Sequence, residues 1–242
     1  MASGTQRLDK VVANSGFGSR KEIKQLIKMG KITVAGVPVK DSGMHVDPDK
    51  DEIVINGQKL EYREFIYLMM NKPAGVVSAT EDNKFKTVVD LVPDAYRHYD
   101  VFPVGRLDRD TEGLLILTND GQLAHDLLSP KKHVPKTYFA EIEGKVNRED
   151  GAAFEEGVVL DDGYKTLPAI LEILESGEMS KIKLTIVEGK FHQVKRMFNA
   201  VGKSVKYLRR IKMGSIDIDS SLELGECREL TADEIERLKN RE

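Results

Sequence analysis

The chain has 242 residues, of which 40% are hydrophobic and 32% charged, and its formal net charge is −3. This length suits one large domain or two small ones, and the apolar content is enough to bury a core, which excludes a globally disordered chain. No apolar run approaches the roughly 20 residues of a membrane-spanning helix, and the first ten residues lack the apolar segment of a secretory signal. We therefore expect a cytoplasmic protein without a membrane partner. The single cysteine, Cys227, excludes an intrachain disulfide and a cysteine-rich zinc site.

The basic residues are concentrated in two zones. Residues 1–40 contain eight Lys or Arg and two acids, a net charge of +6, and residues 189–216 contain eight Lys or Arg and no acid, a net charge of +8. Two separate basic zones in a nearly neutral chain are typical of a protein that binds a polyanion. The alternative is that these side chains only solvate exposed helix faces.

The first 60 residues predict a small unit with two helices and a hairpin. Leu8, Val11 and Val12 indicate a short helix, and Ser19 with Glu22 has the capping-box pattern that begins a second one. The spacing of Arg20, Lys24, Lys28 and Lys31 places these cations within about an 80° arc of that second helix, a face that can follow a phosphate backbone. Further signals are a helix end at Gly30, a hairpin over residues 32–39 and a strand over 52–56.

The chain changes character after Tyr62, and we expect domains at residues 1–61 and 62–242. The second part alternates strand-like and helix-like segments without a regular strand–helix repeat, which favours an α+β fold on a largely antiparallel sheet. The predicted strands are 66–70, 113–118, 137–142 and 181–187. The predicted helices are 122–128, 148–156, 191–201 and 232–240.

Three acids stand at alternating positions before a buried-looking strand: Asp108, Asp110 and Glu112. The neighbouring Arg106 and Arg109 can keep a carboxylate ionised, and an ionised carboxylate can act as a nucleophile or as a base. Spacing alone does not choose among the three acids. The alternative is a charged turn that leads into a strand.

The segment that carries these acids, Gly105-Arg-Leu-Asp-Arg-Asp-Thr-Glu-Gly-Leu-Leu115, resembles the signature of the pseudouridine synthases that modify ribosomal RNA. Further segments match that family in the same order, namely Asn71–Gly75, Lys136–Tyr138 and Glu188–Met197. The N-terminal segments 7–10 and 18–20 resemble the alpha-L RNA-binding module first known from a small-subunit ribosomal protein. The resemblance implies a small N-terminal alpha-L RNA-binding domain and a larger catalytic domain on a mixed, mainly antiparallel sheet with flanking helices.

The resemblance also implies an isomerase that converts a uridine of ribosomal RNA to pseudouridine without a metal or cofactor. It assigns Asp108 as the catalytic aspartate, Tyr138 as the ring that packs on the target base, and Lys195 as the cation that pairs with the aspartate. His192 and Gln193 are expected to be structural, and Phe191 and Met197 to belong to the core. The expected RNA-binding residues are Arg7, Arg20, Lys21, Lys24, Lys28, Lys72, Arg106 and Arg196.

The segment around Lys195 resembles the small-subunit branch, because relatives that act on the large subunit more often have Arg at this position. The implied substrate is uridine 516 of 16S ribosomal RNA, either free or in a small-subunit assembly intermediate, and we expect a monomer. The alternatives are a synthase for a large-subunit rRNA uridine and a non-enzymatic, ribosome-associated RNA-binding protein. A glycosidase with paired carboxylates is disfavoured, since only 6% of the residues are aromatic and none is Trp.

Overall fold

The computed structural model describes residues 4–240 and divides the chain into two compact units. The first unit contains the chain up to Ile66 together with Pro93–Asp100, and the second contains Tyr67–Val92 and the chain from Val101 onward. The predicted domain boundary between residues 61 and 62 stays a prediction. Residues 93–100, which include helix α3 (Asp94–Arg97), also belong to the first unit. No pattern in the sequence predicted this.

The first unit packs two helices on small antiparallel sheets. Helix α1 (Leu8–Asn14) is followed by α2 (Arg20–Lys28), which begins with the predicted capping box of Ser19 and Glu22. The predicted hairpin is present as strands β2 and β3. The strands are β1 (Gln6–Arg7) paired with β4 (His45–Val46), and a sheet ordered β3 (Val37–Pro38), β2 (Ile32–Val34), β5 (Ile53–Ile55), β6 (Gln58–Lys59).

Apolar residues of both helices and of the sheet form the core of this unit. Leu8, Val11 and Ile23 are fully buried against Ile32 and Ile55. Arg20, Lys24 and Lys28 are exposed on α2, as the spacing predicts, and Lys21 is exposed as well. Lys31 is also exposed, but it lies beyond the end of α2 and is therefore not part of the helical face.

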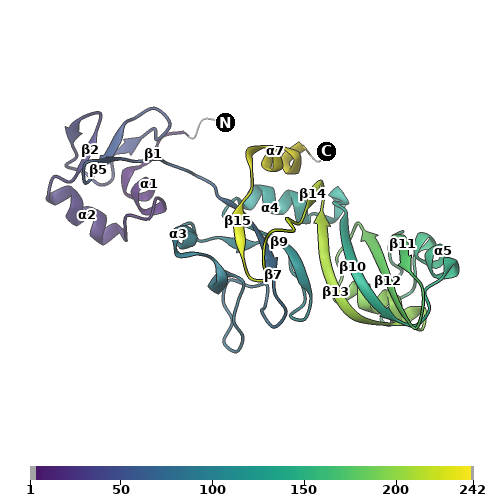
Figure 1. Cartoon of the computed structure of the whole chain (residues 1–242). Coiled ribbons are helices and arrows are strands. Elements are labelled where there is room, and N and C mark those ends of the chain that lie inside the picture. Colours follow the sequence, from purple (N-terminus) through teal and green to yellow (C-terminus); the bar gives the residue numbers. More distant parts are fainter. Residues whose placement is uncertain (1–3, 241–242) are drawn as a thin grey trace. The chain divides into compact units, whose positions relative to one another are not determined.

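The second unit is built on one mixed, mainly antiparallel sheet (Figure 1), which confirms the predicted α+β fold. Strands β13 and β9 form a parallel pair, and the other pairs are antiparallel. The order along the sheet is β11 (Ile170–Glu175), β12 (Met179–Ile186), β10 (Lys136–Glu143), β13 (Ser204–Met213), β9 (Glu112–Thr118), β7 (Tyr67–Lys72) and β15 (Cys227–Glu229); β14 (Ile216–Asp217) pairs with β13, and β8 (Phe102–Pro103) with β9.

Helices flank this sheet. Helix α5 (Arg148–Glu156) contacts β11, α6 (Gln193–Ala200) contacts β13 and α7 (Ala232–Asn240) contacts β14. The rings of Phe154 on α5 and Phe198 on α6 meet edge to face, with centroids 5.1 Å apart, so these two helices share one apolar layer. The helices are α4 (Gly121–Leu128), α5 (Arg148–Glu156), α6 (Gln193–Ala200) and α7 (Ala232–Asn240), with short 3-10 turns at Val89–Leu91 and Pro130–Lys132.

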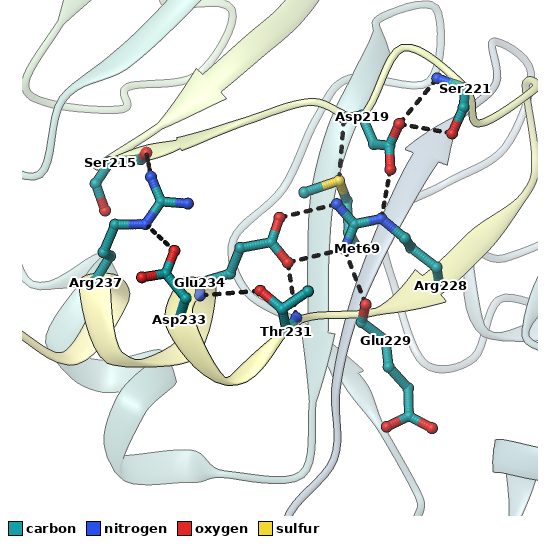
Figure 2. A network of polar contacts seen from close by, with 10 residues as sticks. All are labelled: Met69, Ser215, Asp219, Ser221, Arg228, Glu229, Thr231, Asp233, Glu234 and Arg237. Carbon is teal, nitrogen blue, oxygen red and sulfur yellow. Dashed lines mark hydrogen bonds and ion pairs between the residues drawn. The ribbon is translucent and has the colours of Figure 1, made fainter.

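Arg228 on β15 fastens α7 to the edge of the sheet (Figure 2). It donates two hydrogen bonds of 2.8 Å to Glu234, in the first turn of α7, and one of 2.6 Å to Asp219. Glu234 also accepts a hydrogen bond from the backbone of Thr231 and thereby caps the helix. The hydrogen bonds of Arg228 are the main cause that lowers the pKa of Glu234 to about 2.

Candidate active site

The segment with the three acids is a loop that leads into β9, and the buried Lys72 binds the backbone of this loop. The ammonium group of Lys72 donates to the carbonyl oxygens of Thr111 at 2.8 Å, of Asp108 at 3.1 Å and of Pro73 at 3.0 Å. Burial lowers the pKa of Lys72 to about 8. Lys72 is fully buried, so the expectation that it contacts RNA is wrong. Its role is to hold the backbone of the loop.

Two further contacts fix the loop. The hydroxyl of Ser78 accepts a hydrogen bond from the backbone N–H of Leu107 and donates one to the carbonyl of the same residue, both at 3.1 Å. The backbone N–H of Gly75 donates to the carbonyl of Arg109 at 2.7 Å. Residues 71–78 therefore form the support on which Asp108 is held, since they bond the backbone on both sides of it.

The structure separates the three acids that spacing could not distinguish. Asp108 lines a cleft, and its side chain is 25% exposed. Glu112 accepts a hydrogen bond of 2.7 Å from the hydroxyl of Tyr207 on β13; burial and this bond raise the pKa of Tyr207 to about 12. Asp110 is bound by Lys195. Asp108 is thus the one of the three acids that faces the cleft.

Two basic side chains from the start of α6 approach Asp108. The ammonium group of Lys195 lies 3.5 Å from one carboxylate oxygen of Asp108, and Nε2 of His192 lies 3.5 Å from the other. Lys195 is closer to Asp110, at 2.6 and 2.8 Å from its two oxygens. Loss of water around Asp110 raises its pKa, but the hydrogen bonds and the charge of Lys195 outweigh this, so the pKa lies below its ordinary value.

The cleft has a volume of about 1050 Å³, and a smaller recess of about 70 Å³ shares part of its wall. Asp108, Tyr138 and Arg106 line both cavities. Tyr138 is buried on β10, where it lies opposite Arg210 of β13. The structure thus brings the predicted carboxylate, aromatic ring and arginine to one wall.

Buried cations lie along the same cleft. Arg210 donates from Nε to the carbonyl of Leu114 at 2.8 Å, and Lys136 donates to the carbonyl of Val134 at 2.8 Å. Burial, assisted by the charge of Arg210, lowers the pKa of Lys136 to about 8. Neither was predicted as a site residue. The sequence around Arg210 did not predict a strand, so nothing placed Arg210 in the sheet.

Two other expected residues, Arg196 and Phe191, have different surroundings from those predicted, and a third, Arg7, has an acidic partner within the protein. The side chain of Arg196 is only 15% exposed and is paired with Asp161 and, at 2.7 Å, with Asp162, so its charge is already balanced by two surface aspartates and is not free for RNA. Phe191 is not a core residue, because α6 begins after it and leaves it 72% exposed. Arg7 is half exposed and is bound to Asp9 at 2.7 Å.

The remaining assignments concern structural roles and cofactors. Gln193 is buried and donates to Glu188 at 2.7 Å, as its expected structural role requires. Met197 is fully buried in the core. Within residues 4–240 no group of three or more His, Cys, Asp or Glu is arranged to hold a metal ion. No helix of this part of the chain has the length and apolar content needed to cross a membrane.

Comparison with known proteins identifies the family. Residues 66–200 match the RNA pseudouridylate synthase family, and residues 6–53 match the S4 domain. An uncharacterized RNA pseudouridine synthase of Bacillus subtilis, YtzG, is 56% identical over 96% of this chain and 98% of its own length. The ribosomal large subunit pseudouridine synthase B of the same organism is 41% identical over 97% and 96% of the two chains.

Other relatives extend the similarity to a second class of substrate and to a solved structure. The ribosomal small subunit pseudouridine synthase A of Haemophilus influenzae is 38% identical over 96% of this chain and 99% of its own. A crystal structure of a pseudouridylate synthase is 38% identical, with a TM-score of 0.68 over 96% of this chain and 99% of its own. The chain therefore belongs to the RNA pseudouridine synthase family and carries an N-terminal S4 domain.

Proposed function

We propose that this enzyme isomerises a uridine of ribosomal RNA with Asp108 as its single catalytic carboxylate. The observation that carries the proposal is the position of Asp108: it lines the cleft together with Tyr138, while Asp110 and Glu112 are bound by Lys195 and Tyr207. A carboxylate that lines the cleft and has no short ion pair of its own can reach a substrate held there.

The reaction breaks the bond between N1 of uracil and C1′ of the ribose and forms a bond between C5 and C1′. The proton on C5 is lost and N1 gains one, so atoms and charge balance without an oxidant or a metal. The ionised carboxylate of Asp108 is suited to three steps: attack on the sugar, attack on the base, and removal of a proton from the ribose. The proposal covers all three, since each requires the same carboxylate at the same place.

Tyr138 is proposed to pack on the target base after it leaves the RNA stack. A flipped-out base loses its stacking partners, and an aromatic ring restores about 1–3 kcal/mol per base. Lys195 is proposed to pair with Asp108 and hold its carboxylate in place, and the exposed Arg106 to bind a phosphate beside the cleft. The S4 domain, proposed to span residues 1–61, supplies affinity through Arg7, Arg20, Lys21, Lys24 and Lys28.

For the target we propose uridine 516 of 16S ribosomal RNA, in the free RNA or in a small-subunit assembly intermediate, with the enzyme acting as a monomer. Support comes from Lys195 at the position where large-subunit enzymes more often have Arg. A large-subunit uridine is the second candidate, favoured by the 41% identity to a large-subunit synthase. The two candidates predict pseudouridine in different RNA molecules.

The test is to map pseudouridine in 16S and 23S ribosomal RNA from cells that lack the protein and from cells complemented with wild type or Asp108→Asn. The proposal predicts that one 16S site is lost, restored by wild type and not by Asp108→Asn. Loss of a 23S site would assign the second candidate. Restoration by Asp108→Asn would overturn the role of Asp108, since an amide is neither a useful base nor a useful nucleophile at neutral pH.

A further inference from the structure

Phe191 presents an aromatic ring to solvent at the wall of the cleft. It is 72% exposed and lines the same cavity as Asp108 and Tyr138. A ring this exposed contributes little to the stability of the fold, because burial of apolar surface is what stabilises. Its position beside the reacting groups therefore requires another explanation than packing.

The ring is held in a defined place by its neighbour. Phe191 stacks on the imidazole of His192, with ring centroids 3.7 Å apart and an angle of 20° between the planes. His192 has a φ of +50°, in the left-handed region that residues other than glycine seldom adopt and that is concentrated at functional sites. Nε2 of His192 lies 3.5 Å from a carboxylate oxygen of Asp108. The imidazole of His192 therefore contacts Asp108 and also stacks on the ring of Phe191.

Cations line the same cleft as this ring. Lys190 precedes Phe191 in the sequence and its ammonium group lies 4.4 Å from the centre of the Tyr164 ring, and Lys190, Tyr164 and Arg106 line the cleft. Aromatic rings among cations are the usual surface for unpaired nucleotides: the rings stack on bases and the cations attract the phosphates. An apolar protein partner would require a contiguous hydrophobic patch, and a lone ring between charged residues does not provide one.

We propose that Phe191 stacks on the nucleobase adjacent to the target uridine. This deepens the proposed function and rests on it. Removal of the target base from the RNA stack leaves its neighbour with one face uncovered, and the open face of the Phe191–His192 pair can cover it. Tyr138 then stacks on the flipped base and Phe191 stacks on the base that stays in the RNA. Together the two rings replace the stacking contacts that these bases lose when the target flips out.

The test compares Phe191→Leu and Phe191→Tyr in the full chain. Leu keeps apolar bulk but has no flat ring, whereas Tyr keeps the ring. Kd and KM are measured with 16S and 23S transcripts. Stacking on one base corresponds to a factor of about 5–150, so Phe191→Leu is expected to raise both constants by that factor while Phe191→Tyr restores them. Phe65→Leu, the same change at an exposed ring that does not line the cleft, is the matched control.

The outcomes separate this inference from the proposed function. Kd and KM of Phe191→Leu equal to wild type for both RNAs would overturn the stacking role, whatever product forms. Failure of Phe191→Tyr to restore binding would also overturn it, because a flat ring would then not be what matters. If wild type forms no pseudouridine in either RNA but Phe191→Leu still weakens binding, the stacking role stands and the ribosomal target falls. Melting temperatures of the variants are expected to match wild type, because the side chain is exposed.

Discussion

The ammonium group of Lys195 lies 2.6 and 2.8 Å from the two carboxylate oxygens of Asp110, so this pair forms the closest ionic contact of Lys195. The distance from Lys195 to Asp108 is 3.5 Å. The resemblance implied that Lys195 pairs with the catalytic aspartate. In the structure Lys195 instead interacts with two acids. Asp108 lines the cleft and its side chain is 25% exposed, whereas the side chain of Asp110 is 71% exposed.

We predict that Asp110→Asn does not lower kcat/KM at neutral pH. Loss of the competing charge lets Lys195 interact more strongly with Asp108, which lies 3.5 Å from its ammonium group. The measurement is pseudouridine formation by wild type, Asp110→Asn and the loop control Glu112→Gln. A kcat/KM for Asp110→Asn as low as that of Asp108→Asn would contradict the idea that Asp110 only competes for Lys195.

The exposed cations of α2 are expected to control the salt dependence of RNA binding. The triple variant Arg20→Ala, Lys24→Ala, Lys28→Ala should reduce the slope of log K against log[salt] by about 2, because each phosphate contact contributes about 0.7 on single-stranded RNA. The matched control removes three lysines of the second unit that are partly or fully exposed and paired with glutamates, namely Lys181, Lys183 and Lys206. Equal slopes for wild type and the α2 variant would contradict an RNA-binding role for this helix.

Gly113 permits the close approach of β9 and β13 directly after the loop that carries Asp108. Its φ is +100°, and a Cβ atom there would lie 2.2 Å from the carbonyl oxygen of Arg210. Gly113→Ala is therefore expected to lower the free energy of unfolding by about 3 kcal/mol or more, since both the backbone strain and the clash act on a buried strand pair.

The matched control for Gly113 is Gly151→Ala in helix α5, where nothing lies within 4 Å of the added atom. This change should stabilise the protein by about 0.5–1 kcal/mol, because alanine has the higher helix propensity. Denaturant unfolding of both variants is the measurement. A Gly113→Ala protein as stable as wild type would show that the two strands separate more easily than their pairing indicates.

Glu234 makes stability depend on acid pH. Its folded-state pKa is about 2 against an ordinary value of 4.5, so its contribution is complete above pH 4.5 and is lost as the pH falls toward 2. Glu234→Gln is thus expected to lower the free energy of unfolding by about 3 kcal/mol at pH 6 and by progressively less below pH 4.5. Asp233→Asn, at an exposed ion pair on the same helix, should change it by less than about 1 kcal/mol. A difference between Glu234→Gln and wild type that does not vary with pH would contradict this account.

Local patterns in the sequence predicted much of the fold, because helix caps, hairpin turns and helix periodicity depend only on residues close together in the chain. The capping box at Ser19, the hairpin turn at Ala35 and Gly36, and helices α5 and α7 are where the patterns place them. Strand β13 was missed, although it lies inside the sheet. Its pairing with β10 shifts register after Thr137 and after Glu141, and such shifts break the alternation by which a strand is recognised.

The site depends on contacts that no local pattern contains. The separation of Asp108 from Glu112 requires Tyr207, which is 95 positions away from Glu112 along the chain. Lys72 lies just after the predicted strand 66–70 and precedes a proline, a pattern that predicts an exposed turn. In the structure it is the last residue of β7, and its ammonium group is buried against the carbonyl groups of the loop that it supports. Burial of a charged group is decided by tertiary packing, so its role could not be derived from sequence.

The most direct test of the account is pseudouridine formation by purified Asp108→Asn, Asp110→Asn and Glu112→Gln on 16S and 23S transcripts. The three changes remove one negative charge each from the same loop at nearly constant size. The account predicts that Asp108→Asn forms no product above background while still binding RNA, and that the other two keep at least part of the activity. Substantial product from Asp108→Asn, or an equal loss in all three variants, would contradict the assignment of Asp108 as the single catalytic carboxylate.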